Sequence, residues 1–80
     1  MNAKVFCGWQ SIMIALGNAG YKLPESMIMT DAQLLSRDRS QVEALLSEAA
    51  ILLKIPAGVE IKLVAGFQTY TILSPKKVEI

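Results

Sequence analysis

The chain has 80 residues, 52% of them hydrophobic and 19% charged, which is the composition of one folded domain over residues 1–80 rather than of a disordered segment. Eight lysines and arginines against seven aspartates and glutamates leave a net charge of +1, which gives no electrostatic indication of a nucleic-acid-binding surface. There is no histidine and one cysteine, so histidine-based catalysis, Cys/His zinc sites and an intrachain disulfide are excluded, and we expect no catalytic residue, metal or cofactor.

The first predicted elements lie within residues 3–19. Residues 3–7 fit either a short strand or an extended lead-in. From Trp9 onward the apolar residues follow helical spacing, and Gly20 is placed to end the helix. A strand over residues 11–16 is the alternative. The apolar positions that carry the helical period are Trp9, Ile12, Met13, Leu16 and Ala19.

The next segment contains Pro24 and predicts a loop over residues 21–26. Residues 27–29 are apolar and fit either a short strand or a buried connector. Thr30 or Asp31 is a suitable N-cap for a short helix over residues 32–36. Residues 37–39 then form a polar break.

A capping box at Ser40 and Glu43 predicts a long central helix over residues 40–54, which Pro56 and Gly58 end. Six apolar side chains form one broad face of this helix: Val42, Leu45, Leu46, Ala49, Leu52 and Leu53. Ile51 and Ile55 lie near the opposite side. A helix that is apolar on two sides is expected to be buried on two sides.

The last third predicts an antiparallel β-hairpin with strands over residues 59–64 and 67–73 around Ala65-Gly66. A two-residue loop pairs Leu63 with Gln68 and Ile61 with Tyr70 on an apolar face, and Lys62 with Thr69 on a polar face. Residues 77–80 alternate and fit a short third strand. The predicted fold class is α+β: two to three helices followed by this hairpin.

At this length a single core supplies only about 3–5 kcal/mol, and neither a disulfide nor a metal is available to add to it. We therefore expect a homo-oligomer, a dimer or higher, that acts as a non-enzymatic protein–protein interaction module, for instance a small regulator or inhibitor of an unidentified protein. Candidate interface residues are the apolar side chains in excess of what one small core would bury: Ile51, Ile55, Met27, Met29, Trp9 and Tyr21.

The alternative is a DNA-binding regulator, because the order of helix, helix–break–helix and hairpin is similar to the layout of a winged helix. The cations available to it are Arg37, Arg39, Lys62, Lys76 and Lys77. The long helix carries Glu43 and Glu48 where a recognition helix needs basic side chains, so nucleic-acid binding is the weaker hypothesis. Lys62, Lys76 and Lys77 also fit a second role, as charges that keep a strand edge from pairing.

Cys7 precedes the first predicted helix, where a thiol can be reactive, or it is a small buried hydrophobe; the sequence leaves both open. No apolar run has the length of a membrane span, and we expect no membrane partner. Gly8, Gln10 and Ser11 interrupt the stretch that a secretory signal peptide would need. A lone cysteine without that signal predicts a cytoplasmic protein.

Overall fold

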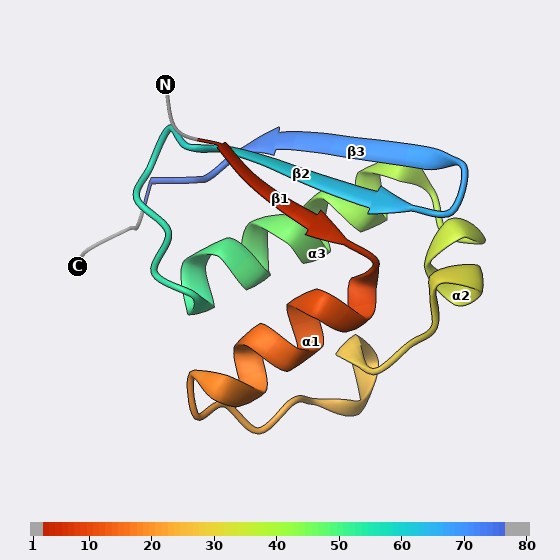
Figure 1. Ribbon diagram of the computed structural model, residues 1–80, viewed down its shortest axis with the longest axis horizontal. Coiled ribbons are helices and arrows are strands. Elements are labelled where there is room, and N and C mark those ends of the chain that lie inside the picture. Colours follow the sequence, from red (N-terminus) through yellow and green to blue (C-terminus); the bar gives the residue numbers. More distant parts are fainter. Residues whose placement is uncertain (1–2, 77–80) are drawn as a thin grey trace.

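The computed structural model describes residues 3–76 and has an α+β fold, in which three helices lie on one face of a three-stranded sheet (Figure 1). The strand order is β1-β2-β3, with β1 parallel to β2 and β3 antiparallel to it. The predicted hairpin is therefore part of a mixed sheet, and the predicted strand over residues 77–80 lies outside the described residues. The elements are β1 (Ala3–Cys7), α1 (Trp9–Asn18), the 3-10 turn η1 (Glu25–Met27), α2 (Asp31–Leu35), α3 (Arg39–Leu52), β2 (Glu60–Ala65) and β3 (Gln68–Leu73).

Helix α1 confirms the helical period read from Trp9, and the alternative strand over residues 11–16 is wrong. Its buried side chains are Trp9, Ile12 and Leu16. Gly20 ends it as predicted, with a φ of 91° that L side chains rarely adopt. The Tyr21 N–H donates to the Leu16 carbonyl at 3.1 Å, which is the long hydrogen bond of a Schellman motif.

Residues 28–30 form an extended connector rather than a strand, and Met27 and Met29 on either side of Ile28 are buried. Thr30 is the N-cap of α2 and makes a reciprocal capping box with Gln33. The Thr30 hydroxyl accepts from the Gln33 N–H at 3.2 Å, and the Gln33 side chain accepts from the Thr30 N–H at 2.9 Å. Helix α2 therefore covers residues 31–35, one residue earlier than predicted.

The predicted capping box at Ser40 is wrong, because α3 begins at Arg39 with Asp38 as its N-cap. The Gln41 side chain accepts a hydrogen bond from the Asp38 N–H at 3.2 Å. Asp38 and Gln41 have the same spacing as Ser40 and Glu43 but start the helix earlier. The earlier start adds a backbone bond, in which the Val42 N–H donates to the Asp38 carbonyl at 3.1 Å.

Helix α3 ends at Leu52 rather than at residue 54, in a second Schellman motif. The Ile55 N–H donates to the Ala50 carbonyl at 3.1 Å, and the Lys54 N–H donates to the Ile51 carbonyl at 3.1 Å. Lys54 occupies the left-handed position with a φ of 58°. That conformation costs a non-glycine residue roughly 1–2 kcal/mol.

The hairpin turn is one residue later than predicted, at Gly66-Phe67. Gly66 has a φ of 59° at the first central position, as a type II′ turn requires, and Ala65 stays in the strand. The predicted pairs are therefore wrong: Leu63 opposes Tyr70, and Ile61 opposes Ile72. Each β2 residue is thus paired two residues further along β3 than predicted. Every side chain stays on its predicted face, because side chains on a strand alternate with a period of two.

Trp9 is the side chain that links the layers of the core. It is fully buried, and its indole N–H donates to the Met27 carbonyl at 2.7 Å. Its backbone N–H donates to the Asp31 carboxylate at 2.8 Å. These two bonds hold the connector between α1 and α2 against the first turn of α1, while α3 packs beneath β3.

Candidate functional site

The predicted interface residues divide into a buried and an accessible group. Trp9, Met27 and Met29 are 0%, 1% and 6% exposed, so each is enclosed by its own chain. Ile51 and Tyr21 are exposed, and Ile55 is half-buried against the core. Contacts with a partner can therefore be made directly only by the second group.

The predicted nucleic-acid residues are scattered, and two of them have partners within the chain. The Arg39 guanidinium lies 5.3 Å from the centroid of the Tyr70 ring, which is a cation–π contact. The Lys62 ammonium lies 3.5 Å from the Glu60 carboxylate. Arg37 and Lys76 are exposed, and Lys77 lies outside the described residues.

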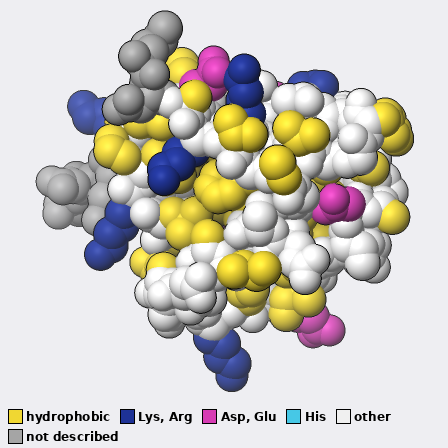
Figure 2. All heavy atoms as spheres, viewed as in Figure 1, with side chains coloured by type: hydrophobic (Ala, Val, Ile, Leu, Met, Phe, Trp, Pro, Cys, Tyr) yellow, Lys and Arg dark blue, Asp and Glu magenta, His cyan; other side chains and the backbone are white. Residues whose placement is uncertain are grey.

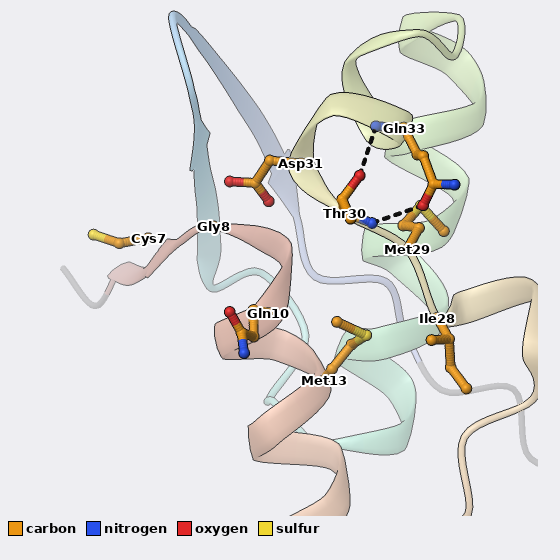
Figure 3. A pocket seen from close by; sticks show the side chains of 9 residues that line it. All are labelled: Cys7, Gly8, Gln10, Met13, Ile28, Met29, Thr30, Asp31 and Gln33. Atoms are coloured by element: carbon orange, nitrogen blue, oxygen red, sulfur yellow. Dashed lines mark hydrogen bonds between the residues drawn. The ribbon is translucent and has the colours of Figure 1, made fainter.

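A hollow of about 510 Å³ lies between the turn from β1 to α1 and the connector that leads into α2 (Figure 3). Asp31 is one of its lining residues, but its carboxylate already accepts the Trp9 N–H and so satisfies a donor in the first turn of α1, a helix without a side-chain N-cap of its own at Gly8. Cys7 is exposed at the rim, so the interpretation of it as a small buried hydrophobe is wrong. Figure 3 shows its thiol pointing away from Asp31 and Gln10. This hollow offers no paired acid and base.

No group of three potential metal-ligating side chains occurs among residues 3–76. Within the same residues, no helix is both long enough and apolar enough to cross a membrane. The surfaces that remain are the open edges and outer face of the sheet and a groove lined by lysines.

Among residues 3–76, β3 is an outer strand of the sheet, and we call the side of β3 that faces away from β2 its open edge. The Gly8 N–H donates to the Val64 carbonyl at 2.7 Å, so Val64 directs its backbone groups toward β1 and away from β3. Its cross-strand partner Thr69 therefore belongs to a non-hydrogen-bonded pair. By alternation along the strand, Thr69, Thr71 and Leu73 direct their N–H and C=O groups to the open edge of β3.

The two edge strands, β1 and β3, differ in the features that keep an edge from pairing with another strand. Strand β3 is Gln-Thr-Tyr-Thr-Ile-Leu, six residues with no charge, no proline and no glycine. Strand β1 is shorter and carries Lys4. Sequence reasoning assigned Lys62 to a protected edge, but β2 is the central strand, so Lys62 protects neither edge.

A second surface lies at the end of the molecule where β1 begins and β3 ends (Figure 1). Two adjacent hollows of about 590 and 360 Å³ share Lys54, Ile55 and Pro56. Figure 2 shows Lys and Arg side chains around hydrophobic ones on this side of the molecule. We call the two hollows together the lysine groove; its other lining residues are Ile51, Ala57, Pro75 and Lys76 in one hollow, and Lys4, Phe6, Ala15 and Leu53 in the other.

Sequence reasoning missed the β3 edge and named only part of the lysine groove, with Ile51 and Ile55 as interface residues and Lys76 as a cation for nucleic acid. The β3 edge needed the position of β1, which the sequence left open, and Lys4 and Lys54 are far apart in sequence. The signal present was the run of uncharged residues 68–73. Comparisons of the chain with models of protein families, with curated proteins and with solved structures give no match.

Proposed function

We propose that the protein is a non-enzymatic interaction module that self-associates through the open edge of β3. The observation that carries this proposal is the row of outward backbone groups at Thr69, Thr71 and Leu73 on a strand without charge or proline. An edge of this kind is a template for another strand. A cytoplasmic location is part of the proposal and rests on the lone cysteine.

The partner strand that fits best is β3 of a second copy. A two-fold axis at Thr71 places Thr71 opposite Thr71 of the second copy and Thr69 opposite the second copy's Leu73. Each outward N–H then faces a carbonyl of the other copy, and each outward carbonyl faces an N–H. On the inner face Tyr70 meets Ile72, an aromatic and β-branched pair of a kind that stabilises sheets. No charged residue of β3 is opposed to another, because the strand has none.

The size of the chain also favours this arrangement. Two copies joined in this way form one continuous six-stranded sheet with all helices on one face. Such a sheet lengthens the core of a chain that has neither a disulfide nor, among the described residues, a metal site. It also removes the least protected edge from solvent.

The test is the mass in solution of a proline variant. The Thr71 N–H faces away from β2, so Thr71→Pro leaves the hydrogen bonds within the chain in place but removes a donor from the edge. We expect wild type at high micromolar concentration to sediment with twice the 8.7 kDa mass of one chain and Thr71→Pro to sediment at 8.7 kDa.

The matched control is Val5→Pro, which alters the outward N–H of the opposite edge strand and should keep the doubled mass. A second variant, Thr71→Lys, places two like charges across the two-fold axis and should also give 8.7 kDa. Circular dichroism confirms that each variant is folded. Wild type at 8.7 kDa throughout, or Val5→Pro alone giving the single-chain mass, contradicts the proposal.

The DNA-binding alternative stays a hypothesis with less support. Helices α2 and α3 are joined by the three residues 36–38, which agrees with the short break between two helices in the winged-helix layout. The only basic side chain of α3, however, is Arg39, which lies over the ring of Tyr70; the other exposed residues of the helix are Ser40, Gln41, Ala44, Glu48 and Ile51. A salt-dependent mobility shift with generic duplex DNA tests this alternative.

A further inference from the structure

We propose that the lysine groove binds an acidic amphipathic segment of another protein, with apolar side chains of that segment in the two hollows and its carboxylates on Lys4, Lys54 and Lys76. This surface is distinct from the β3 edge. It identifies a partner by chemistry, and it can be tested whether or not the chain self-associates.

The charges of the groove are of one sign. Lys4, Lys54 and Lys76 are exposed at its rim, and no aspartate or glutamate of the described residues lines either hollow. The chain as a whole is almost neutral, at +1, so this local excess of positive charge is not a consequence of composition. Complementary charge is the feature that selects partners and directs their approach.

The floor of the groove is apolar and recessed. Phe6, Leu53 and Ile55 are half-buried and lie against the core, and Ile51 is 44% exposed beside them. Hollows of about 360 and 590 Å³ are large enough for inserted aliphatic or aromatic side chains. A partner therefore gains apolar burial between the points of charge contact.

Lys54 stands where helix termination favours glycine. It is the one non-glycine residue with positive φ among those described. It belongs to residues 54–56, which line both hollows and which we call the rib. The Schellman motif that ends α3 requires this conformation, and it places the Lys54 charge on the segment that both hollows share.

The rib itself is held in place before any ligand binds. The Schellman motif fixes Lys54 and Ile55 on one side, and Ser74 fixes the other side. The buried Ser74 hydroxyl donates to the Pro56 carbonyl and accepts from the Val59 N–H at 3.3 Å. A preformed site lowers the ordering cost of binding.

A protein segment fits this groove better than a bilayer does. A membrane-inserting surface presents protruding apolar side chains, whereas Phe6, Leu53 and Ile55 of the groove are half-buried against the core. The most protruding hydrophobic residue of the described chain is Phe67, 89% exposed, and the β2–β3 turn that carries it lies at the opposite end of the molecule (Figure 1). An amphipathic helix laid in a groove uses the recessed geometry directly.

The test uses two labelled helical peptides with Leu at positions i, i+3, i+4 and i+7, one with Glu and one with Lys at the remaining positions. Fluorescence anisotropy measures their binding to the full chain. We expect the Glu peptide to bind about tenfold more tightly than the Lys peptide, with an affinity that falls as salt rises.

Matched variants separate the groove from general charge. Lys54→Gln should weaken the Glu peptide about two- to fivefold, whereas Lys22→Gln, which removes the same charge from an exposed loop outside the groove, should leave it unchanged. Lys54→Gly should weaken binding while raising the midpoint of urea unfolding, a combination that a merely structural lysine would not give.

Equal affinity for both peptides, or equal effects of the Lys54 and Lys22 variants, overturns the proposal. So does binding to anionic lipid vesicles or duplex DNA that depends on Lys54 while the Glu peptide does not bind. Each of these outcomes can be told from failure of self-association, because the anisotropy titration can be repeated with Thr71→Pro at single-chain mass.

Discussion

The substitution Trp9→Phe tests how much the buried indole and its hydrogen bond contribute to the stability of the core. It removes the indole N–H that donates to the Met27 carbonyl at 2.7 Å within the core, and it shortens a side chain that is fully buried. A buried carbonyl left without its donor costs about 1–3 kcal/mol. The lost volume of roughly 40 Å³ adds about 1 kcal/mol at ~24 cal/mol per Å³ of cavity.

The expected loss is therefore about 2–4 kcal/mol, against a total stability of roughly 4–12 kcal/mol for a chain of this length. Urea unfolding followed by far-ultraviolet circular dichroism measures it, because Trp9 is the single tryptophan and the variant has no indole fluorescence. The control is Ile12→Val, a buried truncation on the same helix without a hydrogen bond, which should lose about 0.5–1.5 kcal/mol. A loss in Trp9→Phe no larger than in the control would refute the reasoning.

Three further predictions concern single residues, and thermal or urea unfolding checks each. Asp31→Ala should cost about 0.5–2 kcal/mol, since it uncaps α1; no loss would mean that the Trp9 N–H has another acceptor. Gly66→Ala should destabilise by about 1–2 kcal/mol, whereas Gly17→Ala, within α1 and with open space around it, should stabilise by about 0.5–1 kcal/mol; effects of the same sign would contradict the type II′ turn. Ser40→Ala should change stability by less than about 0.5 kcal/mol, since Asp38 is the N-cap; a larger loss would favour the later helix start.

Local signals in the sequence were enough to predict that three helices exist. The apolar spacing from Trp9 and the stop at Gly20 are confirmed, and of the two caps left open, Thr30 and Asp31, the structure uses Thr30. The start of α3 shows where local reasoning fails. Two overlapping capping patterns were present, and the helix uses the one that starts earlier, at Asp38 and Gln41.

The sheet could be predicted only in part, because its pairing is not local. The alternation in β2 and β3 assigned the faces correctly, but the turn moved by one residue to place Gly66 at the position that needs positive φ. The pairing of β1 with β2 joins Ala3 to Glu60 across most of the chain, and no short pattern encodes such a contact. For this reason the sequence left residues 3–7 open.

The candidate surfaces depended on these same long-range contacts. Apolar character alone selected Trp9 and Met27, which the core encloses, as readily as Ile51, which is exposed. In the lysine groove Lys4 and Lys54, which lie far apart in the sequence, line one hollow, so no local spacing indicates that they lie near each other. Exposure and pairing, not composition, identify both surfaces.

Hydrogen exchange of single amides, measured by NMR at several protein concentrations, tests whether β3 pairs with β3 of a second copy. If it does, the N–H groups of Thr69, Thr71 and Leu73 become protected as concentration rises, while those of Val5 and Cys7, on the other edge, stay unprotected. A Thr71 N–H that exchanges at the rate of an unpaired amide at every concentration would contradict it.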